Sequence, residues 1–530
     1  MKYGIQNCAM ELIFCSGKSY SDPFNDVELD VLFTSPDGSE LKVPAFWSGD
    51  QTWRVRYAPS MVGKHHYKTL CSDTSNIDLH GQGDDIEVSP YNGNNPLFKH
   101  GRLKVANDRR HLEHQDGTPF FWLADTWWMG LVKRLKWHEE FQILTADRVK
   151  KGFTVIQIVA GLYPDMDQFD ERGANEAGFP WERNYSRINP NYFDMADLRI
   201  HWLINSGLVP CIVACWGYFI DFAGVEVMKK HWRNLVARYG AYPVVWCMAG
   251  EANMPYYLAP GDKRSDLVAK AKSGWTEVTR YVRELDPYHN PITIHPTDVG
   301  RNQIEDPSLL DIDMLQTGHG GWDSMPNTFQ KVNDSIMAEP KMPVIVGEVC
   351  YEGIGGKSLQ DVQRFAFWSC ILSGAAGHTY GANGIWQVNT KEKPFGPSPH
   401  GMSWGNTPWE EAYQLPGSAQ IGIGKSLLMR YPWWKFEPHH EWVASHATKE
   451  NVRAPYAAGV PNSVRIIYIP NYSSVRVQAI EKETDYRAFY VDPQNGKEYD
   501  LGKITPDQDG NWQSPNPPIF QDWLLVMEKI

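Results

Sequence analysis

The chain has 530 residues, of which 42% are hydrophobic and 22% charged, a composition typical of a globular protein with room for several domains. Its 51 basic and 63 acidic residues give a formal net charge of −12, and no segment of the sequence is rich in lysine or arginine. The charge argues against nucleic acid and anionic membranes as partners and favours a neutral or small substrate.

The N-terminal sequence MKYGIQNCAMELIFCSG does not read as a signal peptide, because Gln6, Asn7 and Glu11 interrupt its apolar residues. No window approaches 18 apolar residues, so we expect no membrane span. The cysteines form no CxxC pair, and five of them lie in or beside apolar runs: Cys211, Cys215, Cys247, Cys350 and Cys370. Buried free thiols indicate a reducing compartment, so we expect a cytoplasmic protein.

Residues 1–95 carry short segments of alternating polarity separated by turn sequences such as SPDGSE and SGDQ. Strands are expected at 27–33, 41–47, 53–57 and 66–71. This spacing predicts an N-terminal β-sandwich with an immunoglobulin-like arrangement.

Residues 96–438 have a different sequence pattern, in which apolar strands alternate with amphipathic helices. The expected strands are 120–125, 153–159, 208–215, 244–249, 291–295, 313–317, 344–349 and 377–380. Helical patterns fall at 137–151, 192–206, 225–239, 263–285, 328–338, 359–373 and 419–429. The pattern predicts an α/β fold, a (β/α)8 TIM barrel. A doubly wound open sheet is the alternative, but no GxGxxG follows the first strand.

Residues 439–530 return to short strands, expected at 463–470, 486–491 and 522–529, with PQNG and DQDG turns between them. We therefore predict a second β-sandwich at the C-terminal end of the chain.

Two predicted barrel strands end in the same way, with a glycine and then a glutamate. The sequences are PVVWCMAGE, ending at Glu251, and PVIVGE, ending at Glu348. In a TIM barrel the carboxyl ends of the strands carry the chemistry, and these glutamates follow the fourth and seventh strands. We expect a catalytic pair. The alternative is a structural role for each, such as pairing with an arginine.

Polar and aromatic residues also follow or end other predicted strands, and a ring of such groups suits a polyhydroxylated ligand. The candidate substrate-binding residues are Asp125, Trp127, Trp128, Trp216, Asn253, His295, His319, Tyr380 and Trp386. Trp127 and Trp128 are also compatible with a core role. The two longest connections, 160–190 and 382–417, are expected to roof the cleft, because long loops in compact domains are usually functional.

Metal catalysis and serine catalysis have little support in the sequence. The adjacent pairs His65–His66 and His439–His440 would point apart on a strand, and neither HExxH nor GxSxG occurs. We therefore expect no metal and no other cofactor. The sequence leaves a homo-oligomer open.

Several segments resemble the apiosidase-like branch of the retaining (β/α)8 glycoside hydrolases. GTPFFWLADTWW at 117–128, KKGFTVIQIV at 150–159 and residues 189–217 are similar to the first three barrel units of that family. WRVRYAP at 53–59 resembles the small sandwich that precedes such barrels. YVDPQNGKEYDLG at 490–502 and NPPIFQDWLLV at 516–526 are similar to a domain that follows them, often labelled collagen-binding. The resemblance covers nearly the whole chain.

The resemblance implies a glycosidase acting on a carbohydrate, with Glu348 matching the family nucleophile and Glu251 the acid/base. The chain departs from the family at Ala249-Gly250-Glu251, where Gly-Gly-Asp is common, so the reaction class transfers more directly than apiose as the sugar. The alternative function is a non-catalytic carbohydrate-binding or structural protein on a barrel scaffold.

Overall fold

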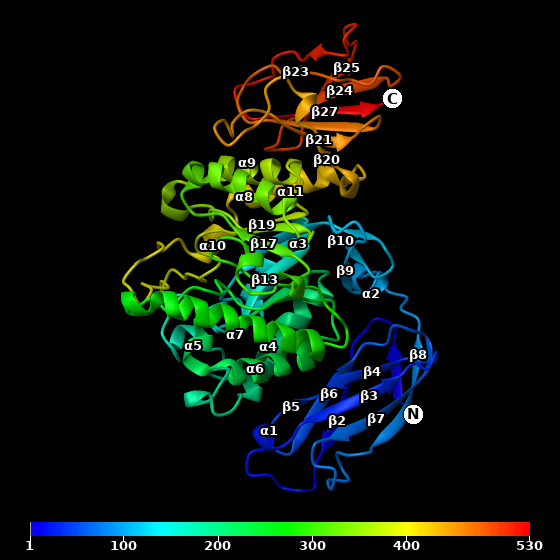
Figure 1. The fold of residues 1–530 in the computed structure, drawn as a ribbon, viewed down its shortest axis with the longest axis vertical. Coiled ribbons are helices and arrows are strands. Elements are labelled where there is room, and N and C mark those ends of the chain that lie inside the picture. Colours follow the sequence, from blue (N-terminus) through cyan, green and yellow to red (C-terminus); the bar gives the residue numbers. More distant parts are fainter. Residues whose placement is uncertain (1) are drawn as a thin grey trace.

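The computed structural model describes residues 2–530 as three parts of an elongated molecule (Figure 1). The N-terminal domain (blue) lies at one end, the α/β barrel (cyan to yellow) in the middle and the C-terminal domain (orange to red) at the other end. The order of the parts along the molecule is therefore their order in the sequence.

The N-terminal domain contains two facing sheets. One has the strand order β1 (Lys2–Ile5), β8 (Gly83–Ser89), β7 (Gly63–Cys71), β3 (Leu29–Thr34), β4 (Glu40–Pro44), and the other β2 (Met10–Cys15), β6 (Thr52–Tyr57), β5 (Phe46–Trp47). Alternate residues of β3 are buried, as expected for a strand with one face in a core. In β6 the alternation ends at Val55, because Arg56 is also buried, where it pairs with Asp197 of the barrel. The rings of Phe33 and Tyr57 stack across the two sheets at 3.9 Å. The predicted N-terminal β-sandwich is thus present.

A small antiparallel sheet that the sequence did not predict leads into the barrel. It contains β9 (Leu103–Val105), β10 (Leu112–His114) and β11 (Pro119–Phe120), and the short helices α1 (Pro23–Asp26) and α2 (Pro96–Lys99) precede it in the chain. These strands have two or three residues each, too short for a period-2 pattern to stand out.

Eight parallel strands form the barrel, which confirms the predicted fold class. They are β12 (Trp122–Trp127), β13 (Val155–Leu162), β14 (Val209–Cys215), β15 (Val245–Cys247), β16 (Ile292–Thr293), β17 (Asp313–Gln316), β18 (Val344–Glu348) and β19 (Gly377–Tyr380). Every residue of these strands is buried except Gln316, because the inward face packs in the barrel and the outward face packs on helices.

Seven helices of the barrel layer fall where the helical patterns predict them. They are α3 (Glu139–Lys150), α4 (Pro190–Asn205), α6 (Val225–Tyr239), α7 (Arg264–Leu285), α8 (Met325–Met337), α9 (Gln360–Leu372) and α11 (Pro416–Leu428); α5 (Phe219–Ala223) and α10 (Trp409–Ala412) are short additions. The start of α4 follows its sequence: Pro190 occupies the first turn, and Oδ1 of Asn189 accepts a bond of 3.2 Å from the backbone N–H of Asn191.

The barrel is nearly closed, with its seam between β16 and β17. The connection between these strands contains only the 3-10 turns Gly300–Asn302 and Pro307–Leu309 instead of an α-helix. The backbone N–H of Asp311 donates to the carbonyl of Ile292 at 2.8 Å, which partly bridges the seam.

The C-terminal domain is a sandwich of unequal layers. A sheet of β20 (Glu437–Pro438), β21 (Tyr456–Val460), β22 (Val464–Ile469), β27 (Trp523–Lys529), β24 (Tyr486–Val491) and β25 (Glu498–Lys503) faces a small sheet of β23 (Arg476–Val477) and β26 (Trp512–Gln513). Ile467 and Leu525 belong to the core of this domain, whereas the alternate residues Tyr468 and Val526 belong to the core of the barrel. The large sheet therefore buries both of its faces.

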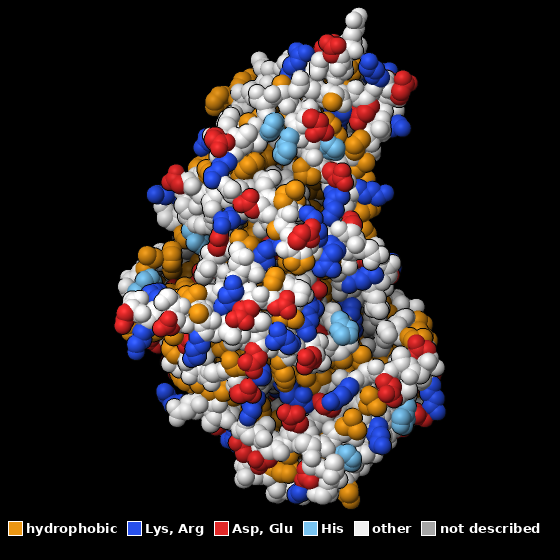
Figure 2. Space-filling model, in the orientation of Figure 1, with side chains coloured by type: hydrophobic (Ala, Val, Ile, Leu, Met, Phe, Trp, Pro, Cys, Tyr) orange, Lys and Arg blue, Asp and Glu red, His pale blue; other side chains and the backbone are white. Residues whose placement is uncertain are grey.

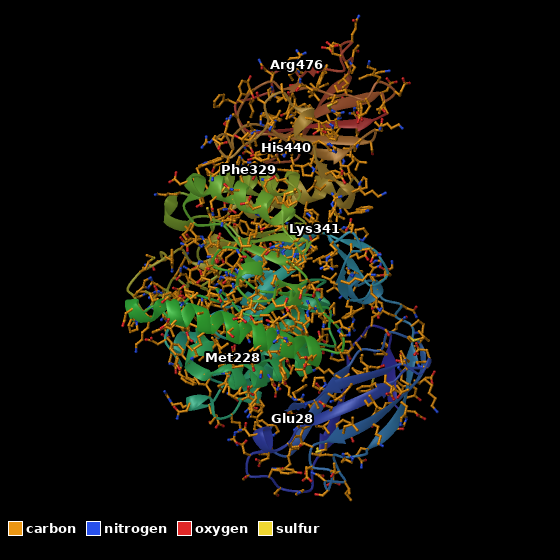
Figure 3. All side chains as sticks on the ribbon, in the orientation of Figure 1. Glu28, Met228, Phe329, Lys341, His440 and Arg476 are labelled. Carbon is orange, nitrogen blue, oxygen red and sulfur yellow. The ribbon has the colours of Figure 1, made fainter. Side chains whose placement is uncertain are left out.

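The barrel and the C-terminal domain are held together by α9. The Arg364 guanidinium makes two bonds to the Asp522 carboxylate, at 2.7 and 2.9 Å, and both side chains are buried. Phe329 on α8 contacts the ring of Tyr456 at 6.1 Å, and Phe329 and His440 lie at the level of this boundary in Figure 3. A bidentate arginine–carboxylate pair in a packed interface fixes orientation as well as contact.

Basic and acidic side chains are interspersed on the face shown in Figure 2 and do not gather into a patch of one sign. Among residues 2–530 no helix is long and apolar enough to cross a bilayer. The five cysteines predicted to be buried are buried free thiols.

Candidate active site

A cavity of about 360 Å³ lies at the carboxyl ends of the barrel strands and contains both predicted glutamates. The lining residues are Trp128, Pro164, Asp165, Trp216, Glu251, Met254, Tyr257, Arg264, Gln316, His319, Glu348, Tyr351, Ile354, Trp386, His400, Met402 and Trp404. Both long loops contribute: 160–190 supplies Asp165, and 382–417 supplies Trp386 and Trp404. The predicted roof over the cleft is therefore present.

Glu251 is positioned by an extension of the barrel sheet beyond β15. The backbone N–H of Gly250 donates to the carbonyl of Cys215 at 2.9 Å, and that of Gly217 donates to the carbonyl of Gly250 at 2.7 Å. Glu251 then adopts a φ of 43°, in the left-handed region that few residues other than glycine occupy. Such backbone conformations persist where the surroundings enforce them, and they cluster at functional sites.

The residue before Glu251 must be small. A Cβ on Gly250 would come within 2.3 Å of the Trp216 ring, so only glycine allows this indole to lie against the backbone. From that position Nε1 of Trp216 donates to Oε2 of Glu251 at 3.1 Å, and Nε2 of Gln316 donates to Oε1 at 3.1 Å. Both carboxylate oxygens of Glu251 are thereby oriented.

The pKa of Glu251 is raised above its ordinary value. Burial is the main cause, since it disfavours the charged form, and the negative charge of Glu348 acts in the same direction. These effects outweigh the bond from Gln316 and the nearby His295, which favour the ionised form. Glu251 is therefore the glutamate that more readily keeps a proton.

Glu348, the last residue of β18, is surrounded by hydrogen-bond donors. The Tyr351 hydroxyl donates to Oε2 at 2.5 Å, Nε2 of His319 lies 2.9 Å from Oε1, and Nε2 of His295 lies 3.2 Å from Oε2. Burial alone would raise the pKa of this carboxyl, but His295 and His319 outweigh burial and lower the pKa to about 2. Glu348 in turn raises the pKa of His319 against the effect of burial. Glu348 is therefore ionised at neutral pH.

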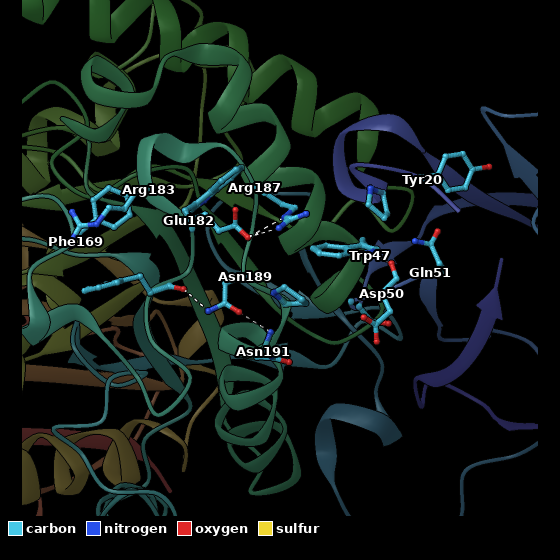
Figure 4. A pocket seen from close by; sticks show the side chains of 16 residues that line it. Tyr20, Trp47, Asp50, Gln51, Phe169, Glu182, Arg183, Arg187, Asn189 and Asn191 are labelled. Atoms are coloured by element: carbon cyan, nitrogen blue, oxygen red, sulfur yellow. Dashed lines mark hydrogen bonds and ion pairs between the residues drawn. The ribbon is translucent and has the colours of Figure 1, made fainter. Parts of the chain in front are cut away.

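A second, larger cleft lies between the N-terminal domain and the barrel (Figure 4). Its volume is about 780 Å³, and its lining comes from both domains, including Trp47, Glu182 and Arg187. Arg187 pairs with Glu182 at 2.8 Å and lies over the Trp47 ring at 5.6 Å. The lining of this cleft has no two glutamates in opposed protonation states, so the smaller cavity is the better candidate for catalysis.

Comparison with known families decides the assignment. Residues 106–435, more than half of the chain, match the model described as "Apiosidase-like, catalytic domain". The chain belongs to the apiosidase-like family. Residues 5–72 match a domain of unknown function, DUF5060, which accounts for most of the N-terminal sandwich. Membership of the family makes the protein a glycosidase, in agreement with the resemblance found in the sequence.

Solved structures share the fold of this apiosidase-like protein at low sequence identity. A structure described as "Glycoside hydrolase" matches with a TM-score of 0.67 and 22% identity, covering 82% of this chain and 98% of the other. A glycoside hydrolase family 5 protein from Bacteroides vulgatus matches with a TM-score of 0.67 and 21% identity, covering 82% and 94%. A further Bacteroides vulgatus structure covers all of both chains, with a TM-score of 0.71 and 16% identity. No curated protein matches.

The apiosidase-like cavity brings together most of the site residues predicted from the sequence. Those in its lining are Trp128, Trp216, Glu251, His319, Glu348 and Trp386. His295 lies behind the lining, fully buried, with its ring against the edge of Trp128 at 5.1 Å and its Nε2 beside Glu348. Asn253 is half-buried next to the site, and its backbone N–H donates to Gln303.

Besides Asn253 and His295, three predicted substrate contacts are absent from the lining of the cavity: Asp125, Trp127 and Tyr380. Asp125 and Trp127 are alternate residues of β12 whose side chains meet the helical layer. Oδ2 of Asp125 accepts bonds of 2.6 Å from Arg148 on α3 and from the Trp127 indole. The Tyr380 hydroxyl donates to Glu352 at 2.5 Å, outside the cavity. We assign these residues to the fold instead of to substrate binding.

Sequence reasoning did not single out several polar residues of the lining: Asp165, Tyr257, Arg264, Gln316, Tyr351 and His400. Trp404 belongs to the loop 382–417, which was predicted to roof the cleft. Tyr351 is three residues beyond a predicted catalytic glutamate, and Gln316 is the penultimate residue of the strand predicted at 313–317, so both lie where the sequence indicated a site. Asp165 and Trp404 lie in long loops whose course the sequence does not specify. Within residues 2–530 no group of three side chains is arranged to hold a metal ion.

Proposed function

We propose that this glycosidase retains the configuration of the anomeric carbon and works by double displacement, with Glu348 as nucleophile and Glu251 as acid/base. The observation that carries the proposal is the contrast between two glutamates in one cavity. Glu348 accepts from Tyr351 and lies beside two histidines that lower its pKa to about 2, while burial and Glu348 raise the pKa of Glu251. Double displacement requires these opposite states of the two carboxyl groups.

In the first step a carboxylate oxygen of Glu348 forms a bond to the anomeric carbon while the bond to the leaving oxygen breaks. Glu251 transfers its proton to that oxygen, so the leaving group departs as an alcohol. In the second step Glu251 takes a proton from water, and the water oxygen displaces Glu348 from the sugar. Each step inverts the anomeric carbon, so the product keeps the original configuration.

The substrate in this proposal is a small glycoside or a short oligosaccharide. The cavity of about 360 Å³ has walls from both long loops and from the indoles of Trp128, Trp386 and Trp404. A small enclosed space with aromatic walls fits one or a few sugar rings better than a long polymer. Apiose is a candidate from the family description, but the side chain of Glu251 is one methylene longer than the aspartate common in the family.

The first test is a panel of 4-nitrophenyl furanosides and pyranosides of both anomers, with NMR used to identify the anomer released first. We expect hydrolysis of at least one substrate, with the same anomer in the first product. Release of the opposite anomer would contradict retention, and inactivity on the whole panel would favour the non-catalytic carbohydrate-binding alternative.

The second test separates the two glutamates. In Glu251→Ala a nitrophenyl glycoside should still glycosylate the enzyme, because its leaving group needs no proton, and azide should restore turnover with the anomer retained. In Glu348→Ala turnover should nearly vanish, and azide rescue should give the inverted glycosyl azide. Exchanged anomeric outcomes between the two variants would reverse the assignment.

A further inference from the structure

Asp165 is a third carboxyl group of the cavity, and the double displacement does not use it. The residue is only 8% exposed, yet it lines the same cavity as Glu251 and Glu348. Its backbone lies in the left-handed region, with a φ of 55°. Among residues 2–530 it makes no ion pair with a lysine, arginine or histidine.

The protein contacts of Asp165 are few for a buried acid. The Trp404 indole donates to Oδ1 at 3.5 Å, the outer limit of a hydrogen bond, and the backbone N–H of Asp165 donates to the Tyr257 hydroxyl at 3.1 Å. Burial raises the pKa of the carboxyl, against the effects of Trp404 and Tyr257 and the weaker electrostatic effects of His400 and Arg172. A buried carboxylate that is not paired with a cation is costly, so its presence needs an explanation other than stability.

Asp125 shows what a structural buried acid looks like in the same barrel. Its carboxylate accepts from Arg148, from the Trp127 indole and from the backbone N–H of Thr126, at 2.6, 2.6 and 2.9 Å. These bonds satisfy both oxygens and neutralise the charge. Asp165 lacks such a set and faces the cavity instead.

We infer that Asp165 is a specificity-determining residue that accepts hydrogen bonds from hydroxyl groups of the sugar, and that the cavity therefore takes a neutral sugar with free hydroxyls at this end. The inference rests on the proposed function. Asp165 comes from one long loop, Trp404 from the other, and Tyr257, stacked on His400 at 5.0 Å, closes the wall between them. A carboxylate between aromatic groups selects hydroxyls through its acceptor oxygens and repels an acidic sugar at the same position.

The test uses the full chain with Asp165→Ala and Asp165→Asn. The probes are the best hydrolysed 4-nitrophenyl glycoside of the panel, its monodeoxy analogues and the corresponding uronide. For the parent glycoside we expect kcat/KM of Asp165→Ala to fall about 10- to 100-fold, the range for a hydrogen bond to a charged group. For the analogue that lacks the contacted hydroxyl, wild type and Asp165→Ala should become equal. The wild type should discriminate against the uronide, and Asp165→Ala should do so less.

Asp167→Asn is the matched control, because Asp167 is an exposed acid of the same loop outside the cavity lining. Its kcat/KM should equal that of the wild type. Thermal unfolding gives a second readout. Asp165→Asn removes a buried charge, so its Tm should match or exceed that of the wild type. If Asp165 instead stabilised the fold, the same substitution would lower the Tm.

Two results would overturn the inference while leaving the glycosidase proposal intact. One is full activity of Asp165→Ala in the presence of an active wild type. The other is an equal loss on the parent glycoside and on every deoxy analogue, which would make the effect independent of any hydroxyl. A wild type inactive on the whole panel would instead overturn both the proposed function and the inference.

Discussion

The Tyr351 hydroxyl donates a hydrogen bond of 2.5 Å to Oε2 of Glu348. The same hydroxyl accepts a bond of 2.9 Å from the Trp128 indole. The Tyr351 ring lies between His319 and Trp386, stacked on them at 5.0 and 5.9 Å. Glu348 is thus held by a phenol that is itself fixed from three sides, which is how a nucleophile is kept in a productive orientation.

We predict that Tyr351→Phe lowers kcat/KM about 10- to 100-fold, because a hydrogen bond to a charged carboxylate is lost while the stacked ring remains. The pKa of Glu348 should rise without this donor, so the acid limb of the pH profile should move to higher pH. The control is Tyr380→Phe, which removes a buried hydroxyl bonded to Glu352 outside the cavity. That variant should lose about 1–3 kcal/mol of stability and keep its kcat/KM. Similar kinetic losses in both variants would contradict the role of Tyr351.

The sequence predicted the parts of the fold and site that depend on local patterns. Glu251 and Glu348 were found because an apolar run of strand length ends at each of them, and the barrel architecture places strand ends together. The barrel strands were predicted from apolar runs of strand length, and the helices between them from their amphipathic patterns. The small sheet of β9, β10 and β11 was missed because its strands are too short to show a period.

The remaining site residues depend on contacts between distant segments. Trp127 and Trp128 are adjacent, and the indole that faces the cavity depends on the residue at which β12 ends. Because the strand ends at Trp127, Trp128 is the one that lines the cavity. The partner of Asp125 is Arg148, 23 residues away on a helix that packs outside the strand. Asp165 meets Trp404 across 239 residues, through two loops whose paths follow from tertiary packing. Local sequence patterns do not predict contacts between residues so far apart in the chain.

Gly250 offers a direct test of how Trp216 orients Glu251. In Gly250→Ala the new methyl would come within 2.3 Å of the indole, so the ring must move and its bond to Glu251 should break. We expect kcat/KM to fall about 10-fold or more and stability to fall by about 1–3 kcal/mol, as is usual for overpacking. Gly261→Ala is the control, since that glycine has open space around its Cβ and no positive φ. Equal activity of both variants would show that the indole is dispensable.

Asp125→Ala distinguishes a structural acid from a substrate contact. The change leaves the Arg148 guanidinium buried without its main partner, so we expect a loss of about 3–5 kcal/mol in urea unfolding. At temperatures where the variant is folded, KM should stay near the wild-type value, because the side chain lies outside the cavity. A stable variant with a raised KM would restore Asp125 to the substrate-binding set predicted from the sequence.

The pH dependence of activity follows from the two glutamates. The nucleophile must be ionised, and the pKa of Glu348 is lowered to about 2. The limb on which kcat/KM increases with pH should therefore lie at strongly acidic pH. The acid must be protonated, and the raised pKa of Glu251 places the falling limb above the ordinary range of a glutamate. In Glu251→Gln, assayed on a nitrophenyl glycoside, the falling limb should disappear. Its persistence would assign the limb to another group, such as His319.

The same shifts have opposite effects on stability. Glu348 has a lowered folded pKa, so its contribution is present above the unfolded value of about 4.3 and is lost as the pH falls toward the folded value of about 2. Glu251 has a raised folded pKa, so the folded state binds its proton more tightly than the unfolded chain, and the contribution is lost as the pH rises through the folded pKa.

Glu251→Gln should therefore gain Tm relative to the wild type as the pH is raised from about 4 to about 8. Glu348→Gln should show its largest deficit in Tm at neutral pH and a smaller one as the pH approaches 2. Thermal unfolding of the three proteins across this range measures both trends. Parallel curves for Glu251→Gln and the wild type would mean that Glu251 titrates as it does in the unfolded chain, and the acid/base assignment would lose its electrostatic basis.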